Sequence, residues 1–365
     1  MAIEVGKIRN VGVVGHGGVG KTSLVEALLF SAGALTRLGK VDDGSTTTDF
    51  DPDEIKRKIS INTAIAYCDW KSHRINLVDT PGYGDFIADA RAGLRVVEAA
   101  IVVVDGVAGV QVQTEKVWKF ANEYNLPRAV VVNRLDRERA DFYRTLESLA
   151  RRLKGRLVAL QIPVGEESGF KGFVDLVKMK AVTYANGKPA EGEIPGDLAD
   201  RVKEYREKLV EAAAETDDEL LNKYLEEGSL GEPEMLKALR AGIAEGKIVP
   251  VLCASASKTM GSGALLDLIV DSLPSPADRG EIAGTDLKSK QAGARPPDPK
   301  APVAALVFKT LSDPHIGKLS LFRVMSGTLR SDSTLLNPLR GAKERMGHVS
   351  WLMGKTQKNV EALGP

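Results

Sequence analysis

A glycine-rich segment near the N-terminus has the residue types and spacing needed to hold phosphate. It reads Gly15-His16-Gly17-Gly18-Val19-Gly20-Lys21-Thr22, is followed by Ser23, and matches the pattern G-x-x-x-x-G-K-[ST]. Glycines let the backbone curl so that successive N–H groups point at phosphate oxygens. We expect Lys21 to reach the β- and γ-phosphates of a nucleotide and the Thr22 hydroxyl to bind Mg²⁺. We expect His16 to contribute only its backbone.

A second segment, Asp79-Thr80-Pro81-Gly82, supplies further groups for the same site. Asp79 directly follows the apolar run 75–78. A carboxylate at the end of a neighbouring strand is where a second Mg²⁺ ligand is expected. Gly82 has no side chain, so its backbone N–H can approach the terminal phosphate. The position after a strand distinguishes this Asp-x-x-Gly from the many that are only turns.

Two later segments predict which base is bound. Asn133-Arg134-Leu135-Asp136 follows the apolar run 129–132. The Asp136 carboxylate can accept hydrogen bonds from the ring N–H and the exocyclic amine of guanine, whereas adenine would leave it unpaired. We expect Asn133 to bridge the base and the glycine-rich loop. Ser255-Ala256 follows the run 249–253, and its backbone N–H can contact the guanine O6 atom.

Five short apolar runs position these loops. Each is nearly continuous rather than alternating, which is typical of strands buried on both faces of a parallel sheet; they are residues 8–14, 75–78, 99–104, 129–132 and 249–253. Helical patterns follow several of them, so we predict a mostly parallel, doubly wound α/β sheet. Residues 60–70 alternate, with Ile61, Thr63, Ile65 and Tyr67 on one side, and predict an edge strand with one exposed face.

The pattern also predicts the domain organisation. We assign residues 1–155 and 247–280 to the nucleotide-binding domain and 156–246 to an inserted α+β subdomain, because the sheet resumes after it. Residues 281–300 contain Gly284, Gly293, Pro296, Pro297 and Pro299 and predict a linker. Residues 301–365 read as short strands separated by turns and predict the start of a β-barrel. We expect this barrel to be truncated at the end of the sequence.

Composition excludes several classes of protein. The chain has 365 residues, of which 43% are apolar and 27% charged, which is the balance of a globular protein of two or three domains. A net charge of +1 gives no electrostatic case for nucleic-acid binding. Cys68 and Cys253 are expected to be buried, reduced thiols. No apolar run approaches the length of a membrane span, so we expect a cytoplasmic protein.

At these motifs the sequence resembles the translational GTPases, and elongation factor G in particular. The stretch from Val41-Asp42-Asp43-Gly44 to Ser60-Ile61-Asn62-Thr63-Ala64 is similar to that family's switch I segment, and Asp79-Thr80-Pro81-Gly82 to its switch II. The length between Asp136 and Ser255 fits the subdomain that elongation factor G inserts there. The resemblance begins near Ile8 and ends inside the family's second domain, so we expect the chain to be a fragment.

Five departures from the family pattern bear on activity. Tyr83 stands where the family has a histidine that orients the attacking water, and tyrosine is neither a base nor a cation at pH 7. Ser60 replaces a switch I threonine on Mg²⁺ but keeps the hydroxyl. Lys58 replaces a glycine, Gly18 an aspartate of the phosphate loop, and Arg134 a lysine that packs on the base. These departures indicate a divergent paralogue of elongation factor G.

The resemblance implies an enzyme that hydrolyses GTP to GDP and phosphate with Mg²⁺. The ribosome would stimulate it, and hydrolysis would release residues 41–60 and 82–85 as a conformational switch in translation elongation. Lys21, Gly82 and Tyr83 are the expected catalytic residues, and Thr22, Ser60 and Asp79 the expected Mg²⁺ ligands. The residues expected to bind GTP or GDP are Gly15, His16, Gly17, Gly18, Val19, Gly20, Lys21, Thr22, Ser23, Asp79, Thr80, Pro81, Gly82, Tyr83, Asn133, Arg134, Leu135, Asp136, Ser255 and Ala256.

Three other functions fit parts of this evidence. Tyr83 also fits a ribosome-binding guanine-nucleotide sensor with little hydrolysis. Within the family, the sequence is also compatible with a ribosome-protection or release-type factor. A kinase is disfavoured, because Asn133, Asp136 and Ser255 specify guanine and no acceptor substrate. We expect a monomer whose partners are GTP and the ribosome, with no DNA or membrane.

Overall fold

The computed structural model describes residues 3–185, 187–286, 289–313 and 317–365. Within them, the main sheet has seven strands in the order β2-β3-β1-β4-β5-β11-β6. All neighbours pair in parallel except β2 and β3. The strands are β1 (Ile8–Gly15), β2 (Ala64–Trp70), β3 (His73–Asp79), β4 (Ala99–Asp105), β5 (Arg128–Asn133), β6 (Arg156–Ala159) and β11 (Ile248–Cys253).

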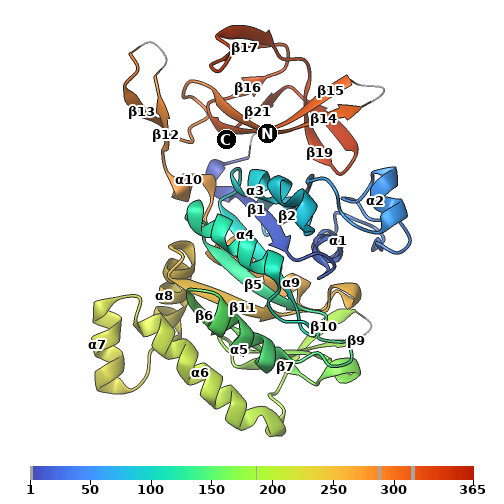
Figure 1. Ribbon diagram of the computed structural model, residues 1–365. Helices are drawn as coiled ribbons and strands as arrows, with labels where there is room; N and C mark the ends of the chain where they lie inside the picture. Colours follow the sequence, from blue (N-terminus) through green and yellow to red (C-terminus); the bar gives the residue numbers. More distant parts are fainter. Residues whose placement is uncertain (1–2, 186, 287–288, 314–316) are drawn as a thin grey trace.

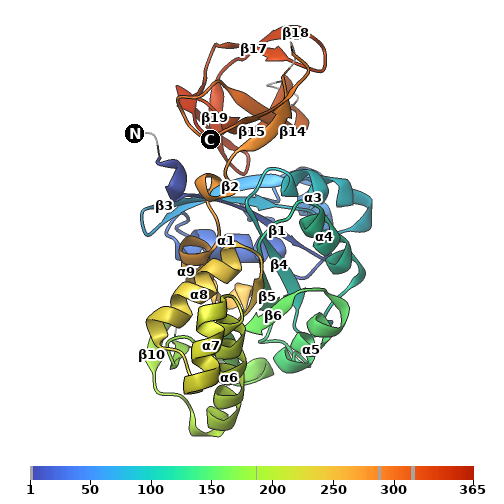
Figure 2. The same cartoon turned by 90° about the vertical axis from the view of Figure 1, so that its left-hand side faces the viewer.

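Helices cover both faces of this sheet, which confirms the predicted doubly wound α/β fold. Figure 2 shows α1 and α9 on one side of the sheet and α3 and α4 on the other. The central strands β4, β5 and β11 are buried along their whole length. The helices are α1 (Lys21–Ser31), α2 (Pro52–Arg57), α3 (Ile87–Leu94), α4 (Val112–Glu123), α5 (Phe142–Arg152), α9 (Ser262–Ser272) and α10 (Pro276–Arg279).

The insertion packs against the end of the main sheet formed by β11 and β6 (Figure 1), and its buried residues join the core of that sheet. It combines a four-stranded antiparallel sheet with three helices, among the residues described. The strands are β7 (Gln161–Val164), β8 (Gly172–Asp175), β9 (Lys180–Ala185) and β10 (Lys188–Gly192), and the helices are α6 (Ala199–Ala214), α7 (Asp218–Glu227) and α8 (Glu232–Ala244). Residues 156–159, which the sequence assigns to the insertion, instead form β6 and pair with β11 in the main sheet.

The last part of the chain forms antiparallel strand pairs on the opposite side of the main sheet (Figure 1). Residues 281–300, predicted to be a linker, include an exposed hairpin of two strands, β12 and β13. The strands are β12 (Ile282–Thr285), β13 (Ala292–Arg295), β14 (Ala304–Asp313), β15 (Gly317–Ser326), β16 (Leu329–Arg330), β17 (Thr334–Asn337), β18 (Ala342–Arg345), β19 (Val349–Met353), β20 (Thr356–Val360) and β21 (Ala362–Leu363).

The edge strand β2, predicted over residues 60–70, begins at Ala64 and differs from its prediction in a second respect. Its inner face consists of Ala64, Ala66 and Cys68, which are buried, and its outer face is covered rather than exposed. The Tyr67 ring lies 6.0 Å from the Trp351 ring of β19, and the Gly354 N–H donates to the Ile65 carbonyl at 2.9 Å. The second domain therefore packs directly on the main sheet.

Two further properties concern the chain as a whole. Cys68 and Cys253 are buried and free, and burial raises the pKa of the Cys68 thiol to about 12. Among the described residues, every helix is too short or too polar to cross a lipid bilayer.

Candidate nucleotide-binding site

The glycine-rich loop connects β1 to α1 at the carboxyl end of the parallel strands. Gly20 has φ 92°, a conformation that favours glycine. A Cβ atom there would lie 2.5 Å from the Asn133 amide nitrogen. A Cβ atom on Gly15 would collide with the Val103 carbonyl oxygen. These glycines therefore permit a close approach between the loop and strands β4 and β5.

Lys21 is the first residue of α1 and is buried inside the loop. Its ammonium donates hydrogen bonds to the carbonyl oxygens of His16, at 2.9 Å, and Gly15, at 3.3 Å. Burial lowers the pKa of Lys21 to about 8, against the opposing effect of Asp79 and Asp49. Phosphate oxygens in the same loop would supply the negative charge that this buried ammonium lacks.

Hydroxyl and carboxylate oxygens gather beside Lys21. The Thr22 hydroxyl donates to Asp79 Oδ2 at 2.9 Å and lies 3.0 Å from the Ser60 hydroxyl. The Thr48 hydroxyl donates to the same Asp79 oxygen at 2.7 Å. The other oxygen, Asp79 Oδ1, is buried and has no hydrogen-bond partner among the described residues, and burial raises the pKa of Asp79. An orphaned carboxylate oxygen beside two hydroxyls fits Mg²⁺, which prefers oxygen ligands.

Asp49 belongs to this cluster, although the sequence did not single it out. Only 5% of the residue is exposed, and it lines the cavity. Burial and the neighbouring Asp79 raise the pKa of Asp49 to about 6. Thr46 and Thr48, in the same polar segment, are buried as well. Nothing in the sequence separates Asp49 from Asp42, since both lie in the same polar segment.

Asn133 connects the predicted base-binding loops. Its side-chain amide donates to the Val19 carbonyl at 2.9 Å, and its carbonyl accepts from the Ala256 N–H at 3.0 Å. The Ser255 N–H donates to the Met260 carbonyl. The Ser255 and Ala256 N–H groups, which were predicted to contact guanine O6, are thus already hydrogen-bonded within the protein. The next residue, Ser257, lines the cavity.

The remaining residues of the loop after β5 take different positions. Asp136 is half-buried and forms an ion pair of 3.4 Å with Lys258. The Arg134 guanidinium donates to Asp105 at 2.7 Å, so its stem is held along the cavity. Leu135 is buried in the hydrophobic core, and neither Leu135 nor Asp136 is among the residues that line the cavity. The Leu135 side chain therefore anchors the loop in the core, and its contact with the nucleotide stays a prediction.

The segment after β3 packs against the glycine-rich loop. A Cβ atom on Gly82 would collide with the Lys21 ammonium, and one on Gly17 would lie 2.9 Å from the Tyr83 ring. Tyr83 is 41% exposed and lines the cavity. Thr80 lies in the core and donates to the Val13 carbonyl. This hydrogen bond connects the segment to β1, and the predicted contact of Thr80 with the nucleotide stays a prediction.

His16 contributes more than its backbone. Its Nδ1 atom accepts a hydrogen bond of 3.4 Å from the Gln113 N–H at the start of α4. Burial, followed by the charge of Lys21, lowers the pKa of His16. The imidazole ring therefore connects the glycine-rich loop to a helix whose position the sequence did not relate to it.

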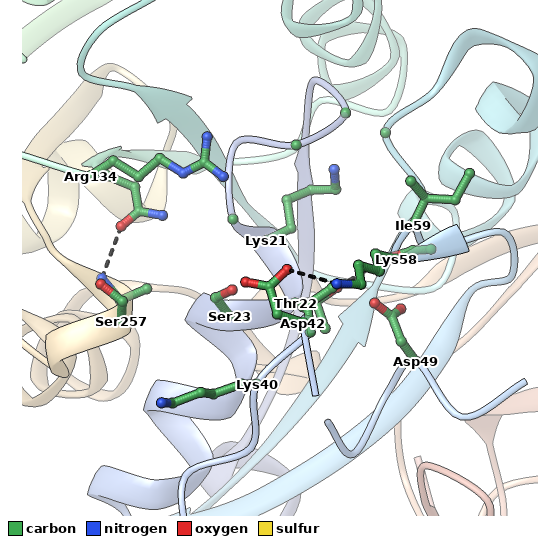
Figure 3. Close-up of a pocket in the computed structure, with 18 of the residues that line it drawn as sticks. Lys21, Thr22, Ser23, Lys40, Asp42, Asp49, Lys58, Ile59, Arg134 and Ser257 are labelled. Carbon is green, nitrogen blue, oxygen red and sulfur yellow. Dashed lines mark hydrogen bonds and ion pairs between the residues drawn. The ribbon is translucent and has the colours of Figure 1, made fainter. Parts of the chain in front are cut away.

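These segments enclose a cavity of about 340 Å³. Figure 3 shows Lys21, Thr22 and Asp49 around it. Its chemistry is suited to an anionic ligand with a divalent cation at one end and a planar base at the other. The lining residues are Gly17, Gly18, Gly20, Lys21, Thr22, Ser23, Leu38, Gly39, Lys40, Val41, Asp42, Asp49, Lys58, Ile59, Ser60, Gly82, Tyr83, Asn133, Arg134, Arg137, Ala256 and Ser257.

Known proteins resemble the chain in both of its parts. Residues 6–275 match the family model described as "Elongation factor Tu GTP binding domain", and residues 302–365 match "Elongation factor G domain 2". Proteins named elongation factor G from Thermotoga petrophila and Thermotoga maritima are each 40% identical over 366 residues, which cover 100% of this chain and 53% of theirs.

A solved structure agrees with the sequence comparison. It is the crystal structure of a Thermus thermophilus protein designated ttk003000868, and it superimposes with a TM-score of 0.86 at 36% identity. The match covers 98% of this chain and 51% of that one, so the chain spans about half the length of the relatives it matches. The chain belongs to the elongation factor G family of translational GTPases.

Proposed function

We propose that this protein binds GTP and GDP with Mg²⁺ and hydrolyses GTP to GDP and phosphate. The observation that carries the proposal is the buried cluster of Lys21, Thr22 and Asp79, in which Asp79 Oδ1 lacks a partner among the described residues. Mg²⁺, when bound, would neutralise charge on the β- and γ-phosphates. Thr22, Asp79 and Ser60 would hold it, and Lys21 would stabilise the phosphate oxygens.

Base selection would depend on Asp136 and Asn133. Lys258 already compensates the Asp136 carboxylate at 3.4 Å, so guanine would have to compete with this ion pair for the carboxylate. Asn133 fixes the distance between the glycine-rich loop and the loop after β11 through two hydrogen bonds. The nucleotide would therefore enter a site whose base and phosphate ends are already connected.

The finer proposal concerns the role of hydrolysis. Ordering of residues 41–60 and 82–85 by the terminal phosphate, and their release after hydrolysis, would make the chain a switch. We place this switch on the ribosome, in the cytoplasm, because the related proteins carry the name elongation factor G. Positioning and charge neutralisation alone give slow hydrolysis, so the ribosome would accelerate it.

Tyr83 favours a second candidate function, a guanine-nucleotide sensor that hydrolyses little GTP. Its ring lies against Gly17, where a group that orients water is required, and a neutral phenol cannot act as a general base at pH 7. Both candidates share the same nucleotide site. They differ only in turnover.

The deciding experiment is single-turnover GTP hydrolysis, with and without 70S ribosomes, for the wild type and Tyr83→His. Stimulation of the wild type by at least tenfold would support the GTPase. Binding without turnover, together with a gain of turnover in Tyr83→His, would support the sensor. A Lys21→Ala variant that still bound GTP at full affinity would contradict both.

A further inference from the structure

One lysine of the second domain reaches the nucleotide-binding domain next to both switch segments. Lys309 lies in β14, and only 10% of its side chain is exposed. Its ammonium donates to Asn62 Oδ1 at 3.0 Å and forms an ion pair with Asp89. Asn62 follows Ser60 by two positions, and Asp89 follows the short helix Gly84–Phe86 in α3. A single side chain thus contacts the ends of two segments that face the cavity.

Thr63, the residue after Asn62, is hydrogen-bonded to the other partner of Lys309, Asp89. The Thr63 N–H donates to Asp89 Oδ2, and the Thr63 hydroxyl donates to the Asp89 carbonyl, both at 3.2 Å. The Asn62 N–H donates to Glu54 at 2.8 Å. Only Ile61 separates Asn62 from Ser60, and the Ser60 hydroxyl lies 3.0 Å from the Thr22 hydroxyl. Movement of Ser60 would therefore be transmitted to Asn62 and Thr63, and from them to Lys309.

A second ion pair between the domains, Arg323 with Glu98, does not contact the segments that face the cavity. The Arg323 guanidinium lies 2.7 Å from Glu98, whose side chain is fully buried, and it donates to the Val96 carbonyl. Arg279 lies 3.4 Å from the same carboxylate. Glu98 and Val96 precede β4 at its amino end, away from the switch segments. This pair can hold the domains together whatever nucleotide is bound.

We infer that Lys309 is a positioning residue for nucleotide binding, which holds Asn62 and Asp89 in the arrangement that places Ser60 beside Thr22. This inference rests on the proposed function. The terminal phosphate would order the segment that ends at Ser60, so a contact that holds this segment in place favours the triphosphate over the diphosphate. Coupling of this kind is reciprocal, so GTP would in turn tighten the contact of Lys309 with the nucleotide-binding domain.

The test compares affinities for a non-hydrolysable, fluorescent GTP analogue and for fluorescent GDP by equilibrium titration with Mg²⁺. Lys309→Met keeps the length of the side chain and removes its donors. We expect Lys309→Met to lower the affinity for the GTP analogue at least fivefold more than the affinity for GDP, which lies within the usual range of coupling. Lys309→Arg, which keeps charge and donors, should remain within twofold of the wild-type ratio. Arg323→Met is the matched control, because it loosens the domains without contacting a switch segment.

Each outcome decides the inference. A Lys309→Met ratio within twofold of wild type, or an equal shift in Arg323→Met, would overturn it. If Lys309→Met does not fold, Asp89→Asn removes the same ion pair and should shift the ratio in the same direction. If the wild type binds neither nucleotide, the proposed function fails as well. If the wild type binds both and only the ratio is unchanged in the variants, the inference alone fails.

Discussion

Replacing Asn133 by alanine tests whether this residue holds the two ends of the nucleotide site together. The side chain is 1% exposed and makes two hydrogen bonds, to the Val19 carbonyl and from the Ala256 N–H. Its removal leaves both backbone groups buried and unpaired. Each such group costs about 1–3 kcal/mol. Because water can enter from the adjoining cavity, we expect a total loss near the lower end, about 2–4 kcal/mol.

Urea unfolding of the nucleotide-free protein measures this loss as a shift of midpoint at constant slope. Asn122→Ala is the matched control, since Asn122 is an exposed residue of α4 and its truncation should change stability by less than about 0.5 kcal/mol. GDP affinity should fall in Asn133→Ala as well. Equal unfolding free energies for Asn133→Ala and Asn122→Ala would refute the reasoning, because the bridge would then contribute nothing before the base binds.

Three further predictions concern the charged groups of the site. Burial lowers the pKa of Lys21 to about 8, and bound phosphate should raise this pKa again. GDP binding at pH 8 should therefore take up protons, and GDP affinity should fall above that pH. Calorimetry in buffers of different ionisation enthalpy measures the proton uptake, which Lys21→Met should abolish. The pKa of Asp49 is raised to about 6 from 3.8, so the native state without nucleotide or Mg²⁺ holds its proton longer than the unfolded state and loses stability as the pH rises from about 4 to about 6. Asp49→Asn should lack this loss, which amounts to at most about 3 kcal/mol, and parallel pH profiles of the two proteins would contradict it. Asp79→Asn should weaken Mg²⁺-dependent binding of the GTP analogue more than tenfold while leaving Mg²⁺-free GDP binding within threefold; equal losses in both would show that Asp79 is not a metal ligand.

The part of the fold closest to the site was predictable because its strands are buried on both faces. Runs such as residues 99–104 and 129–132 are continuous and rich in valine, and the parallel sheet brings their carboxyl ends to one edge. That is why Lys21, Asp79 and Asn133 could be expected together from the sequence alone. Strand β6 was missed because only Leu160 separates it from β7, so one stretch of sequence supplies strands to two different sheets.

Other features depend on contacts that no local pattern records. Asp49 and Thr48 lie in a polar segment, and only packing on Asp79 buries them. The outer face of β2 reads as exposed, because its cover is Trp351, far along the chain. No local pattern distinguishes Lys309 from other surface lysines, because its partners Asn62 and Asp89 are more than 200 residues away in the sequence. Contacts between segments distant in sequence are therefore what the structure adds.

The most direct test of the central claim is base selectivity in equilibrium binding with Mg²⁺. We expect GDP to bind at least 100-fold more tightly than ADP, because adenine would leave the Asp136 carboxylate without the donors that guanine supplies. Asp136→Ala should lose most of this difference. GDP and ADP binding with equal affinity, or no binding of either, would contradict the assignment of this cavity as a guanine-nucleotide site.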